Sequence, residues 1–342
     1  MIISNHTLVK WNKIVDFFDQ IYSRIEDKNI FLSKIRFYSF LRLTVRLLAN
    51  FIIPLFYSIT YNNTTARLHI NKKSSNRLIA SLTTFPLRIN KTWIVIESIL
   101  RQSHKPDKII LWLSKEQFPS IDFLPKKLRN QQKKGLEIRF CEGDIKSHKK
   151  YFYTLKEYPN DFLLTLDDDI IYPTTLIKQL NELNNIYPKA VCCHLALEIK
   201  TNGGKILPFM EWKPLKQFVS PSFNIFFGSG GGTLFPPFSL HHEVLNDNVF
   251  KKHCFYADDV WLNCMCQLND TMIVKSSYNS HCLPIIFFKN QMLASINMVL
   301  NQNDTQIQAV RAHYNKALSS AELLAIVLRV GTREHNSPAI VN

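Results

Sequence analysis

An apolar run that ends in three consecutive acids is the feature of this sequence that most constrains its fold. Residues 162–166 are apolar or of high β propensity, and Asp167, Asp168 and Asp169 follow them directly. Adjacent carboxylates repel one another, and each costs free energy to remove from water. The run therefore predicts a buried strand with an acidic end whose charges need compensation. Mg²⁺ is held by one or two carboxylates together with substrate phosphates. An acidic surface turn is the alternative.

The spacing of the three acids predicts which of them act together. In an extended chain alternate side chains point to opposite sides, so Asp167 and Asp169 share one side and Asp168 points to the other. The carboxyl end of a strand is also where open α/β sheets bind ligands. We therefore expect Asp167 and Asp169 to form a two-pronged metal site at the edge of a sheet.

Strand-like and helix-like segments alternate along the chain. Apolar runs predict strands at 78–83, 109–113, 136–140, 162–166, 190–197 and 272–275, and the remaining patterns predict helices at 91–102, 149–156 and 174–185. Strands that alternate with helices of this length are typical of a largely parallel sheet covered on both faces. The predicted fold class is α/β, with a mostly parallel, Rossmann-like sheet flanked by helices.

The second half of the sequence contains two further distinctive segments. Four of the nine glycines lie within Gly228–Gly232, which we expect to be a flexible loop that lets backbone approach a ligand, with a plain turn as the alternative. Asp258 and Asp259 precede an apolar helix that runs to Leu268. Carboxylates are favourable at a helix N-terminus, so this pair is either a helix cap or a second functional acidic motif.

The N-terminal region is basic. The formal net charge is +15, and eleven basic residues but no acid occur from Lys28 to Lys91. Such an excess suits an anionic lipid surface, a phosphorylated substrate or nucleic acid, and a generic solvated face is the alternative.

The same region is apolar enough to suggest a membrane contact. Residues 31–50 predict a helix on which Lys34, Tyr38, Arg42 and Arg46 recur every four positions and form one stripe. The next apolar stretch, to Thr60, is interrupted by Asn50 and Pro54. A bilayer span needs about 20 apolar residues. We favour a helix in the membrane interface with Arg and Lys towards anionic head groups. A span that begins near Leu43 and a core-packing helix are the alternatives.

Composition excludes several classes of protein. An apolar content of 46% is enough for a sizeable core and argues against disorder. The seven cysteines contain no CxxC pair, so we expect reduced thiols in the cytoplasm instead of a zinc site or a disulfide framework. We see no signal-peptide pattern and no nucleic-acid-binding signature, and we expect no nucleic-acid partner.

Four polar features are expected at one edge of the sheet. They are Thr83 and Thr84 with the following Arg88, Asp144 with the following Lys149, the triplet Asp167 to Asp169, and the pair Asp258 and Asp259. Phosphates with a divalent cation would account for acids and bases in one cleft. Over Arg77–Leu283 this order resembles the nucleotide-sugar glycosyltransferases of the GT-A fold, particularly bacterial enzymes of surface-polysaccharide assembly.

The resemblance implies roles for individual residues. It implies that Asp167, Asp169 and His281 hold Mn²⁺ or Mg²⁺, and that Asp258 or Asp259, with Asp259 favoured, is the general base. It implies that the nucleotide sugar is bound by Thr83, Thr84, Arg88, Asp144, Lys149, Asp167, Asp168, Gly230 and Gly231, and that Asp168 contacts ribose or sugar hydroxyls. The alternatives are a structural role for His281, a solvated helix face for Lys149 and a helix cap for Asp144.

The predicted function is a metal-dependent, inverting glycosyltransferase of cell-surface polysaccharide synthesis. Its partners would be a nucleotide-sugar donor, a glycan or lipid-linked acceptor and the anionic inner face of the cell membrane. We expect a helical extension at 1–70, a GT-A catalytic domain at 71–290 and a helical tail at 291–342. One alternative is a metal-dependent nucleotidyltransferase or phosphotransferase, although no GxxxxGK[ST] phosphate loop is present. The other is a non-catalytic nucleic-acid-binding protein.

Overall fold

The computed structural model describes most of the chain between residues 13 and 317. The described residues are 13–25, 29, 31, 34–62, 66–68, 76–203, 205–278, 282–287 and 302–317. His281, a predicted metal ligand, lies outside them. The division of the chain at residues 70 and 290 stays a prediction.

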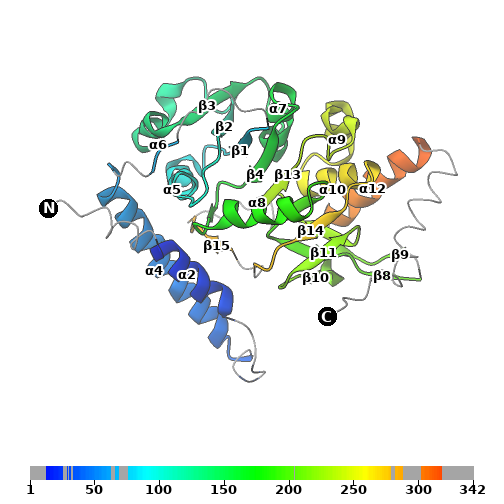
Figure 1. Cartoon of the computed structure of the whole chain (residues 1–342), viewed down its shortest axis with the longest axis horizontal. Helices are drawn as coiled ribbons and strands as arrows, with labels where there is room; N and C mark the ends of the chain where they lie inside the picture. Colours follow the sequence, from blue (N-terminus) through cyan, green and yellow to red (C-terminus); the bar gives the residue numbers. More distant parts are fainter. Residues whose placement is uncertain are drawn as a thin grey trace.

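A mixed sheet of eight strands forms the centre of the molecule (Figure 1). In spatial order the strands are β11 (Val219–Ser222), β14 (Ile273–Lys275), β6 (Val191–Cys193), β13 (Gly231–Phe235), β4 (Phe162–Leu166), β1 (Leu78–Thr83), β2 (Lys108–Ser114) and β3 (Leu136–Cys141). Every neighbouring pair is parallel except those that include β13 or β11. The predicted fold class, a mostly parallel sheet flanked by helices, is confirmed.

Helices cover both faces of the sheet, which explains why its strands are apolar on both sides. On one face the core includes side chains from α2 (Lys13–Arg24), α4 (Phe37–Ile59), α5 (Ile89–Leu100) and α8 (Leu176–Ile186). On the other face it includes side chains from α7 (Lys149–Glu157), α9 (Asp247–His253), α10 (Asp258–Leu268) and α12 (Gln302–Ala317). Along β4, Leu163 packs into the second core and Leu164 and Leu166 into the first, as the two-residue period of a strand requires.

Smaller elements complete the fold. In a small three-stranded sheet, β7 (Ala196–Glu198) lies between β10 (Lys213–Pro214) and β12 (Ile225–Phe227). Two further sheets have two strands each: β5 (Ile170–Ile171) pairs with β15 (Leu283–Pro284), and β8 (Thr201–Asn202) pairs with β9 (Lys205–Ile206). The short helices are η1 (Ile121–Phe123), α6 (Lys126–Asn130), η2 (Gln131–Lys134), η3 (Lys146–His148), η4 (Phe209–Glu211) and η5 (His242–Leu245). The single strand expected at 190–197 is therefore two strands, β6 and β7, in different sheets.

The parallel register brings the predicted site motifs to one edge. Leu78 of β1 is paired with Phe162 of β4, and the two strands run together to Ser81 and Thr165. Because the carboxyl ends of parallel strands meet at the same edge, the residues after Thr83 lie beside the acidic triplet.

The N-terminal helix α4 is longer than expected. It continues through Pro54 as one helix of 23 residues that contains an 18-residue window with a mean hydropathy of 1.5, and by length and composition it could cross a membrane. The expected interruption at Pro54 is wrong, because packing of the face that includes Ala49, Ile53 and Tyr57 stabilises the helix beyond its local propensity. The expected outward basic stripe is also wrong at two positions. Arg42 donates to the carbonyl of Ile25, and Arg46 donates to that of Ile285.

Candidate active site

The acidic triplet lies in a turn and not in an extended segment. β4 ends at Leu166, residues 168 and 169 form a turn, and β5 begins at Ile170. One guanidinium nitrogen of Arg88 lies 2.7 Å from Oδ1 of Asp168 and 2.9 Å from Oδ2 of Asp169. The expectation of an extended backbone at the triplet is therefore wrong, because residues 168 and 169 form a turn. Asp168 and Asp169 share a cation, and Asp167 is paired with a different one.

Asp168 joins the ends of two neighbouring strands. Its side chain is buried, and Oδ2 accepts a hydrogen bond of 2.5 Å from the hydroxyl of Thr84, which in turn accepts one from Thr92 on α5. Burial raises the pKa of Asp168, although Arg88 and Thr84 oppose this shift. Asp168 thus holds the turn and orients Arg88, and its contact with donor hydroxyls stays a prediction.

Asp169 is the member of the triplet whose charge is least well compensated. Burial, together with the charges of Asp167 and Asp168, raises the pKa of Asp169 to about 7. A bound cation would lower this pKa, because an opposite charge favours the ionised form. The group is therefore suited to bind a cation near neutral pH.

The glycine-rich segment packs against Asp167 and is not a flexible loop. Gly231 begins β13, which pairs with β4, and the amide of Asp167 lies 3.3 Å from the carbonyl oxygen of Gly230. A Cβ on Gly230 would lie 1.7 Å from Oδ2 of Asp167, and one on Gly231 would lie 2.3 Å from Cγ of Leu195. The glycines are needed for this close approach. Ser229 and Gly230 do form a turn, closed by the amide of Gly231 on the carbonyl of Gly228, but the turn leads directly into β13 and is packed against Asp167, so the expectation of a flexible loop is wrong.

The pair Asp258 and Asp259 contacts Ser229 of the same glycine-rich segment. The hydroxyl of Ser229 donates to Oδ2 of Asp258 over 2.6 Å, and its backbone amide donates to Oδ1 of Asp259 over 2.7 Å. Both acids lie in the first turn of α10, but its N-cap residue is Ala257, which makes no side-chain cap. The pair is therefore not a simple helix cap, because its carboxylates bind a different segment.

Lys150 connects the two acidic motifs. Its ammonium group lies 2.7 Å from Oδ1 of Asp167 and 2.9 Å from Oδ2 of Asp258, and its side chain is 2% exposed. Burial would lower the pKa of Lys150, but Asp167 and Asp258 outweigh burial and raise it. The amine therefore stays charged and holds the carboxyl end of β4 against the start of α10.

The environment divides the roles of Asp258 and Asp259. Burial would raise the pKa of Asp258, but the charges of Lys150 and His148 and the hydrogen bond from Ser229 oppose it, and the pKa lies below its ordinary value. For Asp259, burial and the neighbouring Asp258 raise the pKa to about 7. Asp259 is also the less buried of the two. A carboxylate whose pKa lies near the working pH is suited to accept a proton, whereas Asp258 is suited to stay ionised.

Asp144 and Lys149 form a separate ionic cluster near the start of α7. Lys149 is buried and paired with Asp144, so it is not a solvated helix residue. Asp144 also accepts hydrogen bonds from Gln117, at 2.8 Å, and from the backbone amide and the ammonium group of Lys146. The amide contact shows that Asp144 does stabilise the local turn. Because Lys149 and Lys150 are consecutive, α7 links this cluster to the acidic motifs.

Thr83 lies at the same sheet edge as Thr84 but has a different contact. Its side chain donates a hydrogen bond of 2.8 Å to the carbonyl of Trp112 on the neighbouring strand β2. The structure thus brings Thr84, Arg88 and the triplet into contact, while Thr83 is turned towards β2.

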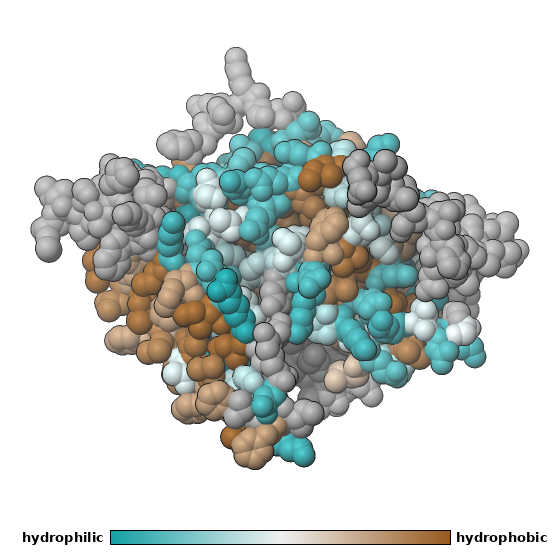
Figure 2. Space-filling view, turned by 60° about the horizontal axis from the view of Figure 1, so that its bottom comes forward, coloured by the Kyte–Doolittle hydropathy of each residue, from teal (hydrophilic) through white to brown (hydrophobic). Residues whose placement is uncertain are grey.

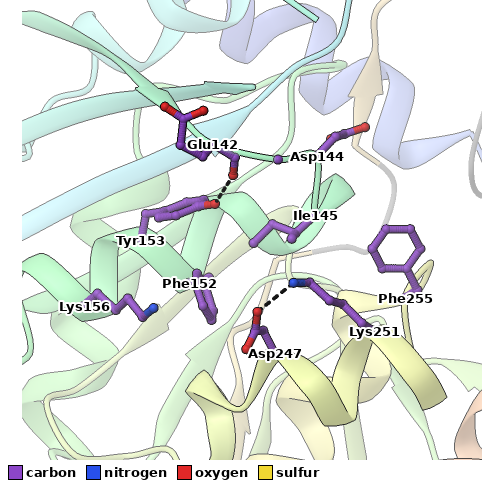
Figure 3. Close-up of a pocket in the computed structure, with 10 residues that line it drawn as sticks. Glu142, Asp144, Ile145, Phe152, Tyr153, Lys156, Asp247, Lys251 and Phe255 are labelled. Atoms are coloured by element: carbon purple, nitrogen blue, oxygen red, sulfur yellow. Dashed lines mark hydrogen bonds and ion pairs between the residues drawn. The ribbon is translucent and has the colours of Figure 1, made fainter. Parts of the chain in front are cut away.

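A cavity of about 480 Å³ lies beside Asp144 and not at the acidic triplet (Figure 3). It is lined by Glu142, Gly143, Asp144, Ile145, Phe152, Tyr153, Lys156, Asp247, Lys251 and Phe255. Figure 3 shows the hydroxyl of Tyr153 bound to the backbone of Glu142, and Asp247 paired with Lys251. No carboxylate of the triplet or of the second acidic motif lines this cavity, so it borders the candidate site without containing its acids.

The donor atoms at the acidic edge fit a hard divalent cation. Mg²⁺ and Mn²⁺ prefer oxygen ligands, and one or two carboxylates suffice when substrate phosphates supply the rest. Among the described residues no group of three or more His, Cys, Asp or Glu side chains could hold a metal. The charge of Asp167 acts on Asp169, so these two carboxylates are the ones that would hold such a metal together with a bound diphosphate.

The roles of two residues of the site were not predicted from the sequence. Lys150 is expected only as one of the basic residues that follow Asp144, with a solvated helix face as the alternative, and Ser229 only as a member of the glycine-rich segment. What distinguishes them is a long-range contact, because Lys150 meets Asp258 across 108 positions of the chain. Spacing along the sequence does not reveal such a contact.

Comparisons with known proteins find no sequence match and remote structural similarity. No protein-family model matches the chain, and no curated protein sequence matches it. Similar solved structures include the mannosyltransferase PcManGT from Pyrobaculum calidifontis in complex with GDP-Man and Mn²⁺, with a TM-score of 0.43 and 11% identity over 84% of this chain and 79% of that chain. S. aureus TarS 1-349 in complex with UDP-GlcNAc has a TM-score of 0.43 and 12% identity over 76% of this chain and 72% of that chain.

Nucleotidyltransferase-like structures are similar as well. An apo UDP-glucose pyrophosphorylase has a TM-score of 0.37 and 11% identity over 72% of this chain and 100% of that chain. At these TM-scores and identities the likenesses are too remote to assign a reaction. The reaction has to be inferred from the site of this chain.

Proposed function

We propose that this protein is a metal-dependent glycosyltransferase. It transfers a sugar from a nucleoside-diphosphate donor to a hydroxyl of a glycan or lipid-linked acceptor, with inversion at the anomeric carbon. The observation that carries the proposal is the meeting of two acidic motifs, Asp167 to Asp169 and Asp258 to Asp259, across Lys150 and Ser229. Asp167 to Asp169 are suited to bind the donor diphosphate with its metal. Asp258 to Asp259 are suited to accept the proton of the acceptor hydroxyl.

Asp259 is the general base in this proposal. Its carboxylate takes the proton of the acceptor hydroxyl while the hydroxyl oxygen forms a bond to the anomeric carbon of the donor. The bond between that carbon and the diphosphate oxygen breaks, and the nucleoside diphosphate leaves with the electron pair. The hydrogen bond from Ser229 to Oδ1 orients the carboxylate, and Asp258 with Lys150 fixes the start of α10 that carries it.

The donor would lie along the edge formed by β1, β4 and the start of α7. Arg88 and Lys150 would supply positive charge there, beside Thr84 and Gly230. Asp144 and Lys149, in the neighbouring ionic cluster, would contact the nucleoside end of the donor. Asp167 and Asp169 would hold Mn²⁺ or Mg²⁺ together with the donor diphosphate. Bound there, the metal would neutralise charge that develops on the departing diphosphate. His281 remains a predicted third ligand.

The cellular role in this proposal is cell-surface polysaccharide synthesis at the cytoplasmic face of the membrane. It is supported by the resemblance of the sequence motifs and by the apolar, basic N-terminal helices. The solved structures similar to this chain are too remote to support it.

The proposal is tested by incubating the purified chain with a panel of nucleotide sugars and Mn²⁺ or Mg²⁺. We expect metal-dependent release of nucleoside diphosphate that is abolished in Asp169→Ala and retained in the surface control Asp122→Asn. Release of pyrophosphate instead would identify a nucleotidyltransferase. Full activity in excess chelator would contradict the role of the metal.

A further inference from the structure

The outward face of α4 is apolar except for the exposed Ser39 and Ser58, and it has no charged side chain. Its exposed residues include Phe40, Leu43, Leu47, Phe51, Leu55 and Ile59. The two charged residues of the helix, Arg42 and Arg46, bind backbone carbonyls on the opposite side. Figure 2 shows apolar surface gathered on the side of the molecule where α2 and α4 lie. A continuous exposed patch of this kind marks a contact with a membrane or with another protein.

The neighbouring helix α2 sorts its charges in a way that favours an anionic membrane. Its two acids turn inwards, where Asp16 accepts hydrogen bonds from Thr174 and Asp19 accepts one from the hydroxyl of Tyr278. The exposed residues of α2 are Lys13, Phe17, Gln20, Ile21 and Arg24. The outward surface of the two helices therefore combines apolar side chains with positive charge only. That combination matches the acyl boundary and head groups of an anionic bilayer.

The opposite face of α4 is bound to the catalytic part of the chain. The side chain of Asn50 donates to the carbonyl of Pro284 over 3.0 Å and accepts from the amide of Ile286 over 2.9 Å. The guanidinium of Arg101 lies 4.8 Å from the ring centre of the buried Tyr57. A transmembrane orientation would carry these polar contacts into the hydrocarbon, where they are costly. We propose that α2 and α4 form an in-plane anchor on an anionic bilayer, with only their outward faces in the lipid.

The anchor is connected to the acidic edge by a single strand. Asn50 binds the segment that contains β15, and the amide of Ile285 in this segment donates to the carbonyl of Asp169 over 2.7 Å. The acidic triplet therefore lies one strand away from the lipid-facing helix. Together with the proposed function, on which this step rests, the geometry assigns the acceptor to the lipid-linked class, with its hydroxyl presented from the bilayer surface.

Vesicle flotation of the full chain tests the anchor without any substrate. We expect binding to vesicles of phosphatidylcholine with phosphatidylglycerol, and weaker binding to phosphatidylcholine alone. Phe51→Glu and Phe40→Glu should each weaken binding roughly tenfold or more, because each removes a large apolar side chain from the lipid and adds a negative charge. Phe238→Glu is the matched control, since Phe238 is 76% exposed and Phe51 is 71% exposed. Equal flotation of all four proteins overturns the proposal.

Nitroxide labels at Leu43, Leu47, Phe51 and Leu55, each introduced as a cysteine, distinguish an in-plane helix from a span. An in-plane helix places all four labels at a similar shallow depth, whereas depths that increase steadily along the helix show a span and overturn the proposal. Self-association without lipid that Phe51→Glu abolishes, combined with no flotation, identifies a second copy as the occupant and also overturns it. Phe51→Glu should still release nucleoside diphosphate from a donor in solution. Flotation therefore tests the anchor, and release of nucleoside diphosphate tests the proposed function separately.

Discussion

Lys150 separates the roles of the carboxylates around it. It is buried and pairs with one acid from each motif, Asp167 and Asp258. Asp258 therefore stays ionised, while Asp259, one position further along α10, has a pKa of about 7. A lysine that compensates two carboxylates from distant parts of the chain holds the site together and leaves one proton acceptor in it.

Replacing Lys150 should therefore weaken both the fold and the activity. Lys150→Met leaves two carboxylates without their buried partner, and removing one member of a buried pair costs about 3–5 kcal/mol of the free energy of unfolding. Lys156→Met, on the exposed side of the same helix, is the control. In urea unfolding, the double variant Lys150→Met with Asp258→Asn should lose less stability than the sum of the single variants. An unchanged stability of Lys150→Met would contradict this role.

The ionised carboxylate of Asp259 should lower the free energy of unfolding, and the size of this effect depends on pH. Its pKa is raised from 3.8 to about 7 in the folded chain by burial and by Asp258. The folded state therefore holds this proton more tightly than the unfolded state. The ionised form destabilises the fold fully above about pH 7, and the cost disappears as the pH falls towards about 4.

Asp259→Asn keeps an oxygen for Ser229 and removes the charge. It should raise the free energy of unfolding at about pH 8 by up to about 4 kcal/mol, with a smaller gain at about pH 5. Urea unfolding at the two pH values measures this difference, with the exposed Asp122→Asn as the control. A loss of stability at the higher pH would show that Asp259 has a structural role instead.

At the scale of secondary structure, β13 is the element that sets the geometry around Asp167. Gly230 precedes it, and a methyl group there would overlap the carboxylate of Asp167. A methyl group on Gly228, two positions earlier, would lie 3.8 Å from its nearest neighbour, Cβ of Leu195, which is ordinary contact. The two glycines thus offer a matched pair of substitutions.

Gly230→Ala should lower stability by about 1–3 kcal/mol, the usual cost of overpacking, and should also weaken donor and metal binding. Gly228→Ala should change neither by a comparable amount. Thermal unfolding and the shift of the melting temperature on addition of nucleoside diphosphate with Mn²⁺ measure both effects. If the two variants had similar stability and similar melting-temperature shifts, the close approach of the Gly230 backbone to Asp167 would not be needed for stability or ligand binding.

Strands could be predicted from the sequence where a run of apolar residues marks both of their ends. The strands at 78–83 and 162–166 match the structure at both ends, because their apolar runs stop at polar residues. The prediction of a flexible loop at the glycine-rich segment is wrong because the place of β13 in the sheet depends on pairing with β4 and β6, which are far away in the sequence. The prediction for Pro54 was wrong because the tertiary packing of α4 overrides a local helix-breaking signal.

At the scale of the whole molecule, the sheet order places the acidic motifs together. The expectation that they meet at one edge follows from strand alternation alone, and β1 and β4 are indeed neighbours. The partners of each acid could not be predicted, because Arg88, Lys150 and Ser229 meet them only in the folded chain. Residues 168 and 169 form a turn, and both acids pair with Arg88. This pairing could not be predicted for the same reason.

The most direct test of the central claim is the rate at which nucleoside diphosphate is released from a nucleotide sugar with Mn²⁺, compared between the wild type and Asp259→Asn. If Asp259 is the base, the variant should remain folded, keep its melting-temperature shift with nucleoside diphosphate, and lose activity by about 10²- to 10⁴-fold. An Asp259→Asn variant as active as the wild type, or a wild type that releases no nucleoside diphosphate from any nucleotide sugar, would contradict the proposed reaction.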